Sequence, residues 1–283
     1  MPPRSQPTAR QMRLGAELRK MREAAGMTAR ETAELLGVNA IQVSQIESGR
    51  AGISEVRLRR LAGHYACAET ELINALVVMA TDRTRGWWEE YRGILPSAFL
   101  DLSELEHHAQ SLRVVATAHV PGILQTEEYA RDVFSYMVPE LPSSEREAWV
   151  AHRLHRRVVL DRDEPLEYEA VLHEAVLRIR VGDRQAARAQ LRETLVLAEH
   201  PSISVRVVPF DVDGFGGANS SLMWAGGPIP RLDTVHRDTP QGSAFVDAES
   251  QLVRARKLFR RVEGASLTPA ASRDFIHRLV QEV

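Results

Sequence analysis

The chain has 283 residues, 44% hydrophobic and 26% charged, and its net charge of −2 argues against both a disordered chain and an indiscriminate nucleic-acid binder. A single cysteine excludes a disulfide framework, and the absence of a long apolar run or signal core leads us to expect a cytoplasmic protein with no membrane partner. Residues 1–60 carry 11 Lys and Arg against 6 Asp and Glu, whereas the rest carry 25 against 32, so a basic N-terminal part precedes an acidic body.

The first ten residues hold three prolines and are expected to form a flexible arm. Its arginines, Arg4 and Arg10, could reach a phosphate backbone, although an unbound tail is the simpler interpretation. A first helix is predicted over residues 11–25, because apolar side chains recur there at helical spacing. These side chains are Leu14, Leu18 and Met21.

Residues 28–50 have the pattern of two short helices joined by a tight turn. Thr28 is placed to cap the first helix, and Glu31 stands three residues on, where a capping box needs its second acceptor. Gly37 supplies the left-handed residue that ends this helix, and Asn39 caps the next one. The side chains expected to face inward are Ala33, Leu36, Val43 and Ile46.

The second of these helices leaves an uncharged face outward. Its exposed residues are expected to be Ala40, Ile41, Gln42, Ser44 and Gln45. A short helix with hydrogen-bonding side chains, preceded by a capped helix and a glycine turn, is what readout of the DNA major groove requires. The pattern alone also allows an ordinary helical hairpin within a larger domain.

Residues 10–80 resemble the helix-turn-helix of the Cro and phage-repressor (XRE) class. The features that carry the resemblance are the Thr28 cap, Ala33, Gly37, Val38, Val43-Ser44 and the ending Ile46-Glu47-x-Gly49. The resemblance implies that Glu47 pairs with Arg22 as an internal brace. Many members of this class have a phosphate-binding glutamine at the position of Ala29. Because alanine cannot make this contact, Arg30 could make it instead.

The same resemblance assigns the residues that would face DNA. Ala40 and Ile41 occupy first-turn positions where polar base readers often sit, so hydrogen-bond readout should fall on other side chains, with Ile41 against a thymine methyl. Gln42, Ser44 and Gln45 are expected to face bases, and Arg30 and Arg50 to face phosphates. The full candidate set is Arg30, Asn39, Ala40, Ile41, Gln42, Ser44, Gln45 and Arg50 for DNA, with Arg22 and Glu47 as the brace.

Two further helices complete an all-α five-helix head over residues 11–80. Ser54 caps the fourth, and the fifth is predicted over residues 69–79. The fourth is expected to bury Val56, Leu58, Leu61, Ala62 and Tyr65. Residues 81–86 are polar and predicted to be a linker. Trp87-Trp88 after it indicates core packing, with a dimer or ligand surface as the alternative.

Residues 87–283 alternate between helical and strand patterns, which predicts an α+β domain with a mixed sheet and helices. The predicted strands are residues 112–120, 166–173, 202–210, 220–224 and 232–236. The predicted helices are residues 99–110, 126–136, 143–160, 174–179, 184–200, 247–262 and 268–283. The first of these helices is expected to turn Leu102, Leu105 and Ala109 inward.

A second resemblance rests on motifs in this domain. They are Val120-Pro121-Gly122-Ile123-Leu124-Gln125-Thr126, Tyr129-Ala130-Arg131, Glu174-x-x-Leu177-Arg178, Val181-Gly182, Gln190-Leu191 and Val205-x-Val207-x-Pro209-Phe210. Residues 85–260 are thereby similar to an antitoxin-like C-terminal domain of actinobacterial XRE regulators, the WhiJ-like group among them. The resemblance implies a transcriptional regulator commonly encoded beside a small partner protein.

No arrangement of residues supports catalysis. His173-Glu174 opens like a zinc-protease motif, but Leu177 stands where the second histidine belongs. A Ser–Lys peptidase is rejected because Lys257 is the only lysine beyond the head, and no cofactor or metal is expected. The glycine-rich loop 213–218 lacks a phosphate-binding lysine.

The domain is therefore expected to bind rather than catalyse. Its aromatic residues Phe210, Phe215 and Trp224 could enclose a small apolar effector, or belong to a plain core with a dimer face, which we favour. A homodimer on double-stranded DNA is expected, because one recognition helix with few base contacts binds weakly alone. The competing hypothesis is an antitoxin-like module that neutralises a small partner protein, with DNA binding secondary.

Overall fold

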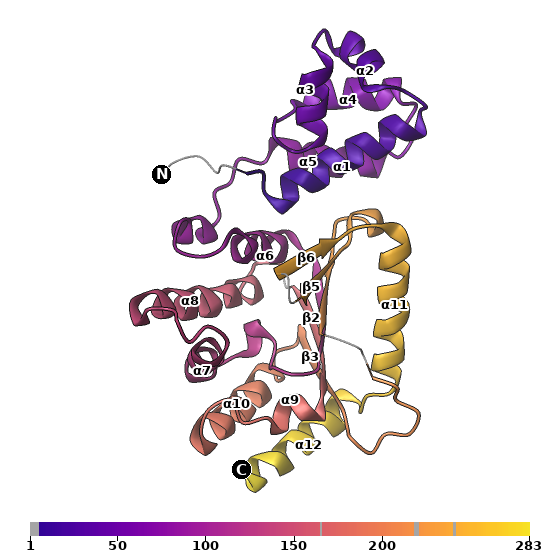
Figure 1. The fold of residues 1–283 in the computed structure, drawn as a ribbon. Coiled ribbons are helices and arrows are strands. Elements are labelled where there is room, and N and C mark those ends of the chain that lie inside the picture. Colours follow the sequence, from indigo (N-terminus) through magenta and orange to yellow (C-terminus); the bar gives the residue numbers. More distant parts are fainter. Residues whose placement is uncertain (1–5, 165, 218–220, 240–241) are drawn as a thin grey trace. The chain divides into compact units, whose positions relative to one another are not determined.

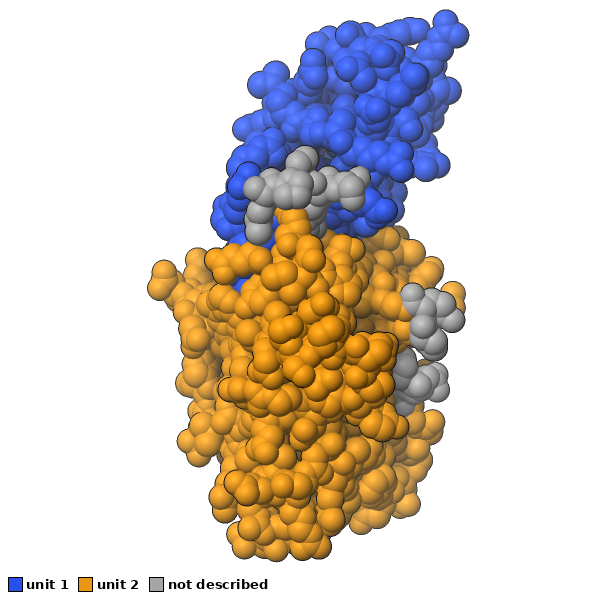
Figure 2. Space-filling model, turned by 60° about the vertical axis from the view of Figure 1, so that its left-hand side comes forward, with its two compact units in different colours: residues 1–89, 228–231 blue, residues 90–227, 232–283 orange. Residues whose placement is uncertain are grey.

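The computed structural model describes residues 6–164, 166–217, 221–239 and 242–283. The chain divides into two compact units (Figure 2): residues 1–89 with 228–231 form unit 1, and residues 90–227 with 232–283 form unit 2. Arg4 and Ser220, which were assigned above to an arm and a strand, lie outside the described residues. An all-helical head followed by an α+β domain is confirmed (Figure 1).

From residue 6 on, unit 1 is built from five α-helices. They are α1 Ala9–Ala24, α2 Ala29–Leu36, α3 Ala40–Glu47, α4 Glu55–His64 and α5 Thr70–Thr81. Helix α1 begins inside the segment expected to be a flexible arm, because Thr8 and Gln11 form a capping box at its start. Arg10 consequently lies on the helix, 3.7 Å from Asp82 at its closest, rather than on a loose tail.

The core of unit 1 contains nearly all the apolar residues that the helical spacing selected. Among them are Leu14, Leu18, Met21, Ala33, Leu36, Val43, Ile46, Leu58, Leu61, Ala62 and Tyr65. Val56 is the exception: it is 77% exposed, because Leu58, Leu61 and Ala62 set the buried face of α4. Trp88 is buried, and a Cβ on Gly86 would come within 2.1 Å of its ring, so this tryptophan is a packing residue.

The described part of unit 2 contains one six-stranded sheet in the order β3-β2-β1-β4-β5-β6. The strands are β1 Ser111–Ala116, β2 Glu167–His173, β3 Ile203–Val208, β4 Leu222–Gly226, β5 Thr234–Thr239 and β6 Gly242–Val246. The first three run parallel to one another, and the last three add antiparallel neighbours. Strand β6 was not predicted, since its five residues are short and half-exposed and show no alternation.

Helices cover both faces of this sheet (Figure 1). They are α6 Ser97–His108, α7 Glu127–Met137, α8 Ser143–His155, α9 Glu174–Arg178, α10 Arg184–Leu197, α11 Glu249–Gly264 and α12 Pro269–Glu282. Helix α11 packs alone on one face through Leu252, Ala255 and Phe259, and most of the others share the second face. The interior strand β2 is consequently buried on both sides, as parallel strands between helical layers usually are.

Two predicted helices differ from the structure. The helix expected over residues 143–160 ends at His155 and continues as the 3₁₀ helix Arg156–Leu160. In α6 the buried positions are Leu100, Asp101, Ser103 and Glu106, whereas the leucines expected to face inward are only partly buried. A glutamate in the last turn of α6 therefore belongs to its buried face.

The motif Val120–Thr126 forms a tight turn whose backbone groups are bonded by side chains. Tyr129 Oη accepts from the N–H of Val120, and Gln125 Nε2 donates to the carbonyl of Val120. Gln190 accepts from the N–H of Thr126 and donates to the carbonyl of Leu124. These bonds stabilise a largely buried turn, because a buried backbone group without a partner is costly.

A buried histidine on α8 gives unit 2 a pH-dependent stability. His152 is 1% exposed, and its Nε2 lies 3.1 Å from Ser103 Oγ. Burial, together with the positive charges of Arg156 and Arg153, lowers the pKa of His152 to about 3. In the unfolded chain the imidazole titrates near 6.5, so the unfolded state takes up the proton first as the pH falls.

We expect the free energy of unfolding of unit 2 to decrease below pH 6.5, by about 2 kcal/mol at pH 5 from His152 alone. The check is urea unfolding at several pH values between 7.5 and 5, for the native protein and for His152→Gln. The variant should lose this part of the pH dependence, while the buried His236, whose pKa is also lowered, contributes equally to both proteins. Equal pH dependence in the two proteins would contradict the assignment.

Candidate nucleic-acid interface

Helices α2 and α3 are each fixed at the N-terminus by a capping box. At α2, Thr28 Oγ1 accepts from the N–H of Glu31 at 3.2 Å, and Glu31 Oε2 accepts from the N–H of Thr28 at 2.7 Å. The bond from the N–H of Thr28, together with one from the Thr28 hydroxyl, lowers the pKa of Glu31. Gly37 ends α2 with φ of +65°, the left-handed conformation predicted for it. The turn between the two helices is therefore set by local chemistry.

The capping box at α3 uses a residue that was expected to read bases. Asn39 Oδ1 accepts from the N–H of Gln42 at 2.9 Å, as predicted for the cap. In return, Gln42 Oε1 accepts from the N–H of Asn39 at 3.3 Å, which the sequence analysis did not anticipate. The carbonyl oxygen of the Gln42 side chain is thus engaged within the helix, and its amide NH₂ stays available.

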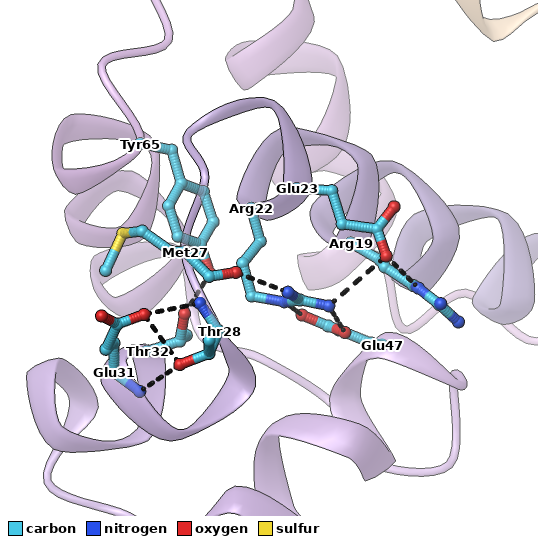
Figure 3. A network of polar contacts seen from close by, with 9 residues as sticks. All are labelled: Arg19, Arg22, Glu23, Met27, Thr28, Glu31, Thr32, Glu47 and Tyr65. Atoms are coloured by element: carbon cyan, nitrogen blue, oxygen red, sulfur yellow. Dashed lines mark hydrogen bonds and ion pairs between the residues drawn. The ribbon is translucent and has the colours of Figure 1, made fainter.

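The predicted brace is present in the structure (Figure 3). Arg22 Nε donates to Glu47 Oε1 at 2.6 Å and Arg22 Nη2 to Glu47 Oε2 at 3.0 Å. Arg22 Nη1 also donates to the carbonyl of Met27, the residue before the Thr28 cap. Both charged groups are about nine-tenths buried, and the bond to Glu47 raises the pKa of Arg22. One guanidinium therefore ties α1 to the start of α2 and to the end of α3.

Helix α3 also rests directly on α1. Val43 and Ile46 are buried, which fixes the rotation of the helix. A Cβ placed on Gly15 of α1 would lie 2.4 Å from the carbonyl oxygen of Glu47, so the two backbones approach more closely than a side chain permits. This close approach and the Arg22–Glu47 pair together hold the C-terminal end of α3.

The outer face of α3 carries the residues that the sequence selected. Ala40, Ile41, Gln42, Ser44 and Gln45 are all exposed. Ile41, Ser44 and Gln45 stand three and four residues apart and therefore share one side of the helix. The structure thus presents a methyl-rich side chain, a hydroxyl and a free carboxamide together, without a charged group among them.

Exposed arginines supply the positive charge of unit 1. Arg30 is exposed and lies 3.6 Å from Glu34, and Arg50 is exposed in the loop after α3. Arg57 and Arg60 on α4 are also exposed, although neither was among the residues predicted to contact DNA. Their spacing of three residues just after the Ser54 cap was a signal that could have identified them.

A segment from the second half of the chain also belongs to unit 1. Arg231 donates to Glu17 Oε2 at 3.2 Å and to Glu69 Oε1 at 2.6 Å, and its carbonyl accepts from Arg13. Glu17 is almost fully buried in α1, and Lys20 donates to it as well. This cluster could not be predicted from the sequence, because Arg231 is between 162 and 218 residues away from Arg13, Glu17 and Glu69 in the chain.

Within the residues described, no three His, Cys, Asp or Glu side chains are grouped so that they could hold a metal ion. None of the helices in the same part of the chain is both long enough and apolar enough to cross a membrane.

Comparison with known families gives two matches. Residues 13–76 match a family described as a helix-turn-helix domain, and residues 99–278 match one described as a domain of unknown function, DUF5753. No curated protein and no solved structure matches the chain. The first match covers the two capped helices described above, and it supports a DNA-binding role for unit 1.

Proposed function

Because the chain belongs to the DUF5753 family and carries a helix-turn-helix domain at residues 13–76, we propose that it is a sequence-specific transcriptional regulator. The observation that carries the proposal is the exposed, uncharged face of α3, held by two capping boxes and by the Arg22–Glu47 pair. A rigid short helix with free hydrogen-bonding groups and flanking arginines suits major-groove readout.

We further propose that the protein acts as a homodimer on a pseudo-palindromic operator. The recognition helix has eight residues, and the side chain of Gln42 is partly engaged in its own cap. One such helix offers few base contacts, and two copies on matching half-sites supply the affinity that one lacks. Sedimentation of the protein with and without operator DNA tests this step: a monomer on a single half-site would contradict it.

We propose that unit 2 senses a protein partner or a small ligand; its resemblance to the WhiJ-like regulators implies a small partner protein encoded nearby. The apolar effector site considered above has little support, because Trp224 packs in the core with α11 and Phe215 packs beside it. An open groove of about 330 Å³, lined by Arg113, Glu169 and Arg206 among others, suits a small polar molecule better. The proposal assigns binding, not catalysis, to this unit.

Two substitutions separate base reading from phosphate contact. Gln45→Ala should lower discrimination by about 1–3 kcal/mol at one base pair of the operator. Arg50→Ala should instead weaken binding to all sequences alike and reduce the salt slope by about one. Arg254→Ala, which removes an exposed arginine of α11 in unit 2, is the matched control and should change neither quantity.

The measurement is fluorescence anisotropy across a salt series, with the DNA upstream of the protein's own gene and a scrambled duplex. Operator-selective binding of a thousandfold or more supports the regulator. If Gln45→Ala and Arg50→Ala behaved identically on both duplexes, the assignment of roles would be wrong. If the native protein bound neither duplex selectively, the antitoxin-like alternative would gain, and a partner that co-purifies with unit 2 would be sought.

A further inference from the structure

The first turn of α3 places one apolar side chain where the protein would meet base edges. Ile41 is 69% exposed and lies on the same side of the helix as Ser44 and Gln45. Folding does not require this exposure, because Val43 and Ile46 alone form the buried seam of α3. The exposed isoleucine on this outward face is therefore available to contact an apolar group of the DNA.

The neighbouring side chain, Gln42, is polar and does not compete with Ile41 for an apolar group. Bidentate reading of adenine by a glutamine uses both the amide NH₂ and the amide oxygen. The oxygen of Gln42 accepts from the backbone N–H of Asn39, so while the capping box is closed this bond holds the carboxamide against the start of the helix. Of the two apolar residues on the first turn of α3, Ala40 and Ile41, Ile41 has the side chain long enough to reach a base edge.

We propose that Ile41 recognises the 5-methyl group of a thymine in each operator half-site. This inference rests on the proposed function. The thymine methyl is the only apolar group that standard bases display in the major groove. Against guanine, adenine or cytosine the same side chain would cover a donor or an acceptor without replacing its hydrogen bond, so it selects for thymine as well as contacting it.

The test replaces thymines of the operator one at a time by deoxyuridine, which removes only the methyl group. At one position in each half-site the native protein should lose about fourfold in affinity, the loss expected for one buried methyl. Ile41→Ala should bind the unmodified operator more weakly and show no further loss at that position. Val56→Ala, which shortens an equally exposed aliphatic side chain on α4, is the matched control and should keep the full loss.

A second experiment tests recognition of the methyl group on a base other than thymine. At the same position a 5-methylcytosine·guanine pair should bind the native protein better than an unmethylated cytosine·guanine pair, whereas Ile41→Ala should not distinguish the two. If no thymine methyl affected the native protein more than Ile41→Ala, the inference would be overturned while selective DNA binding stood. If the native protein showed no operator selectivity at all, the proposed function itself would fail.

Discussion

Glu106→Gln is expected to lower the free energy of unfolding of unit 2 by about 3–5 kcal/mol, the cost of leaving one buried charge unpaired. Glu106 on α6 is fully buried and accepts two bonds from Arg156, at 2.8 Å from Nε and 2.5 Å from Nη2. Burial alone lowers the pKa of Arg156, but the charge of Glu106 and the bonds to it outweigh that effect and raise it. The guanidinium therefore stays charged and needs its partner.

The matched control is a pair of similar geometry on the surface. Arg131 donates to both carboxylate oxygens of Glu147, at 3.0 and 2.9 Å, but both side chains are exposed. Glu147→Gln should change the stability little, because solvent screens the exposed pair. The double replacement Glu106→Leu with Arg156→Met should recover much of the loss, since an apolar pair of similar volume carries no desolvation cost.

Urea unfolding followed by tryptophan fluorescence measures these differences as shifts of the midpoint at constant slope. Hydrogen exchange at α6 and at residues 156–160 would show whether the loss is local to the pair. A cost for Glu106→Gln no greater than that for Glu147→Gln would show that the buried pair does not stabilise unit 2.

The Glu106–Arg156 pair shows why the buried face of α6 could not be predicted from the sequence. The periodicity of residues 99–110 selected Leu102, Leu105 and Ala109, because a local pattern reads a glutamate as exposed. Glu106 faces inward only because Arg156, fifty residues later, lies opposite it in the fold. The helix predicted over residues 143–160 is present as α8 and differs only in its last residues, which form the 3₁₀ helix that carries Arg156.

Unit 1 was predicted more completely because its signals are local. The Thr28 and Asn39 caps, the left-handed Gly37 and the buried seam of α3 each depend on residues within four positions of one another. The long-range contacts of unit 1 could not be predicted from local sequence patterns. The Arg22–Glu47 brace was implied by resemblance to a family rather than by spacing, and the approach of Gly15 to α3 gave no sequence signal.

The close approach of Gly15 to the backbone of α3 predicts a large loss of stability when this glycine is replaced. Gly15 lies inside α1, where helix propensity alone would make Gly15→Ala stabilising by up to about 1 kcal/mol. A Cβ there would lie 2.4 Å from the carbonyl oxygen of Glu47 and 2.7 Å from that of Ile46, and backbone atoms cannot rotate away as a side chain can. We therefore expect Gly15→Ala to destabilise unit 1 by about 3 kcal/mol, the upper range for overpacking.

Gly15→Ala should also weaken DNA binding. Moving α3 away from α1 stretches the Arg22–Glu47 pair and shifts the whole reading face, so affinity should fall for the operator and for scrambled DNA together. Gly63→Ala in α4 is the control: nothing lies within 4 Å of the added Cβ, and this variant should be slightly more stable and bind normally. Thermal unfolding with hydrogen exchange at α1 and α3, together with anisotropy, gives both readouts. If both alanine variants were stabilised alike, α1 would not be what positions α3, and the brace alone would have to hold the recognition helix.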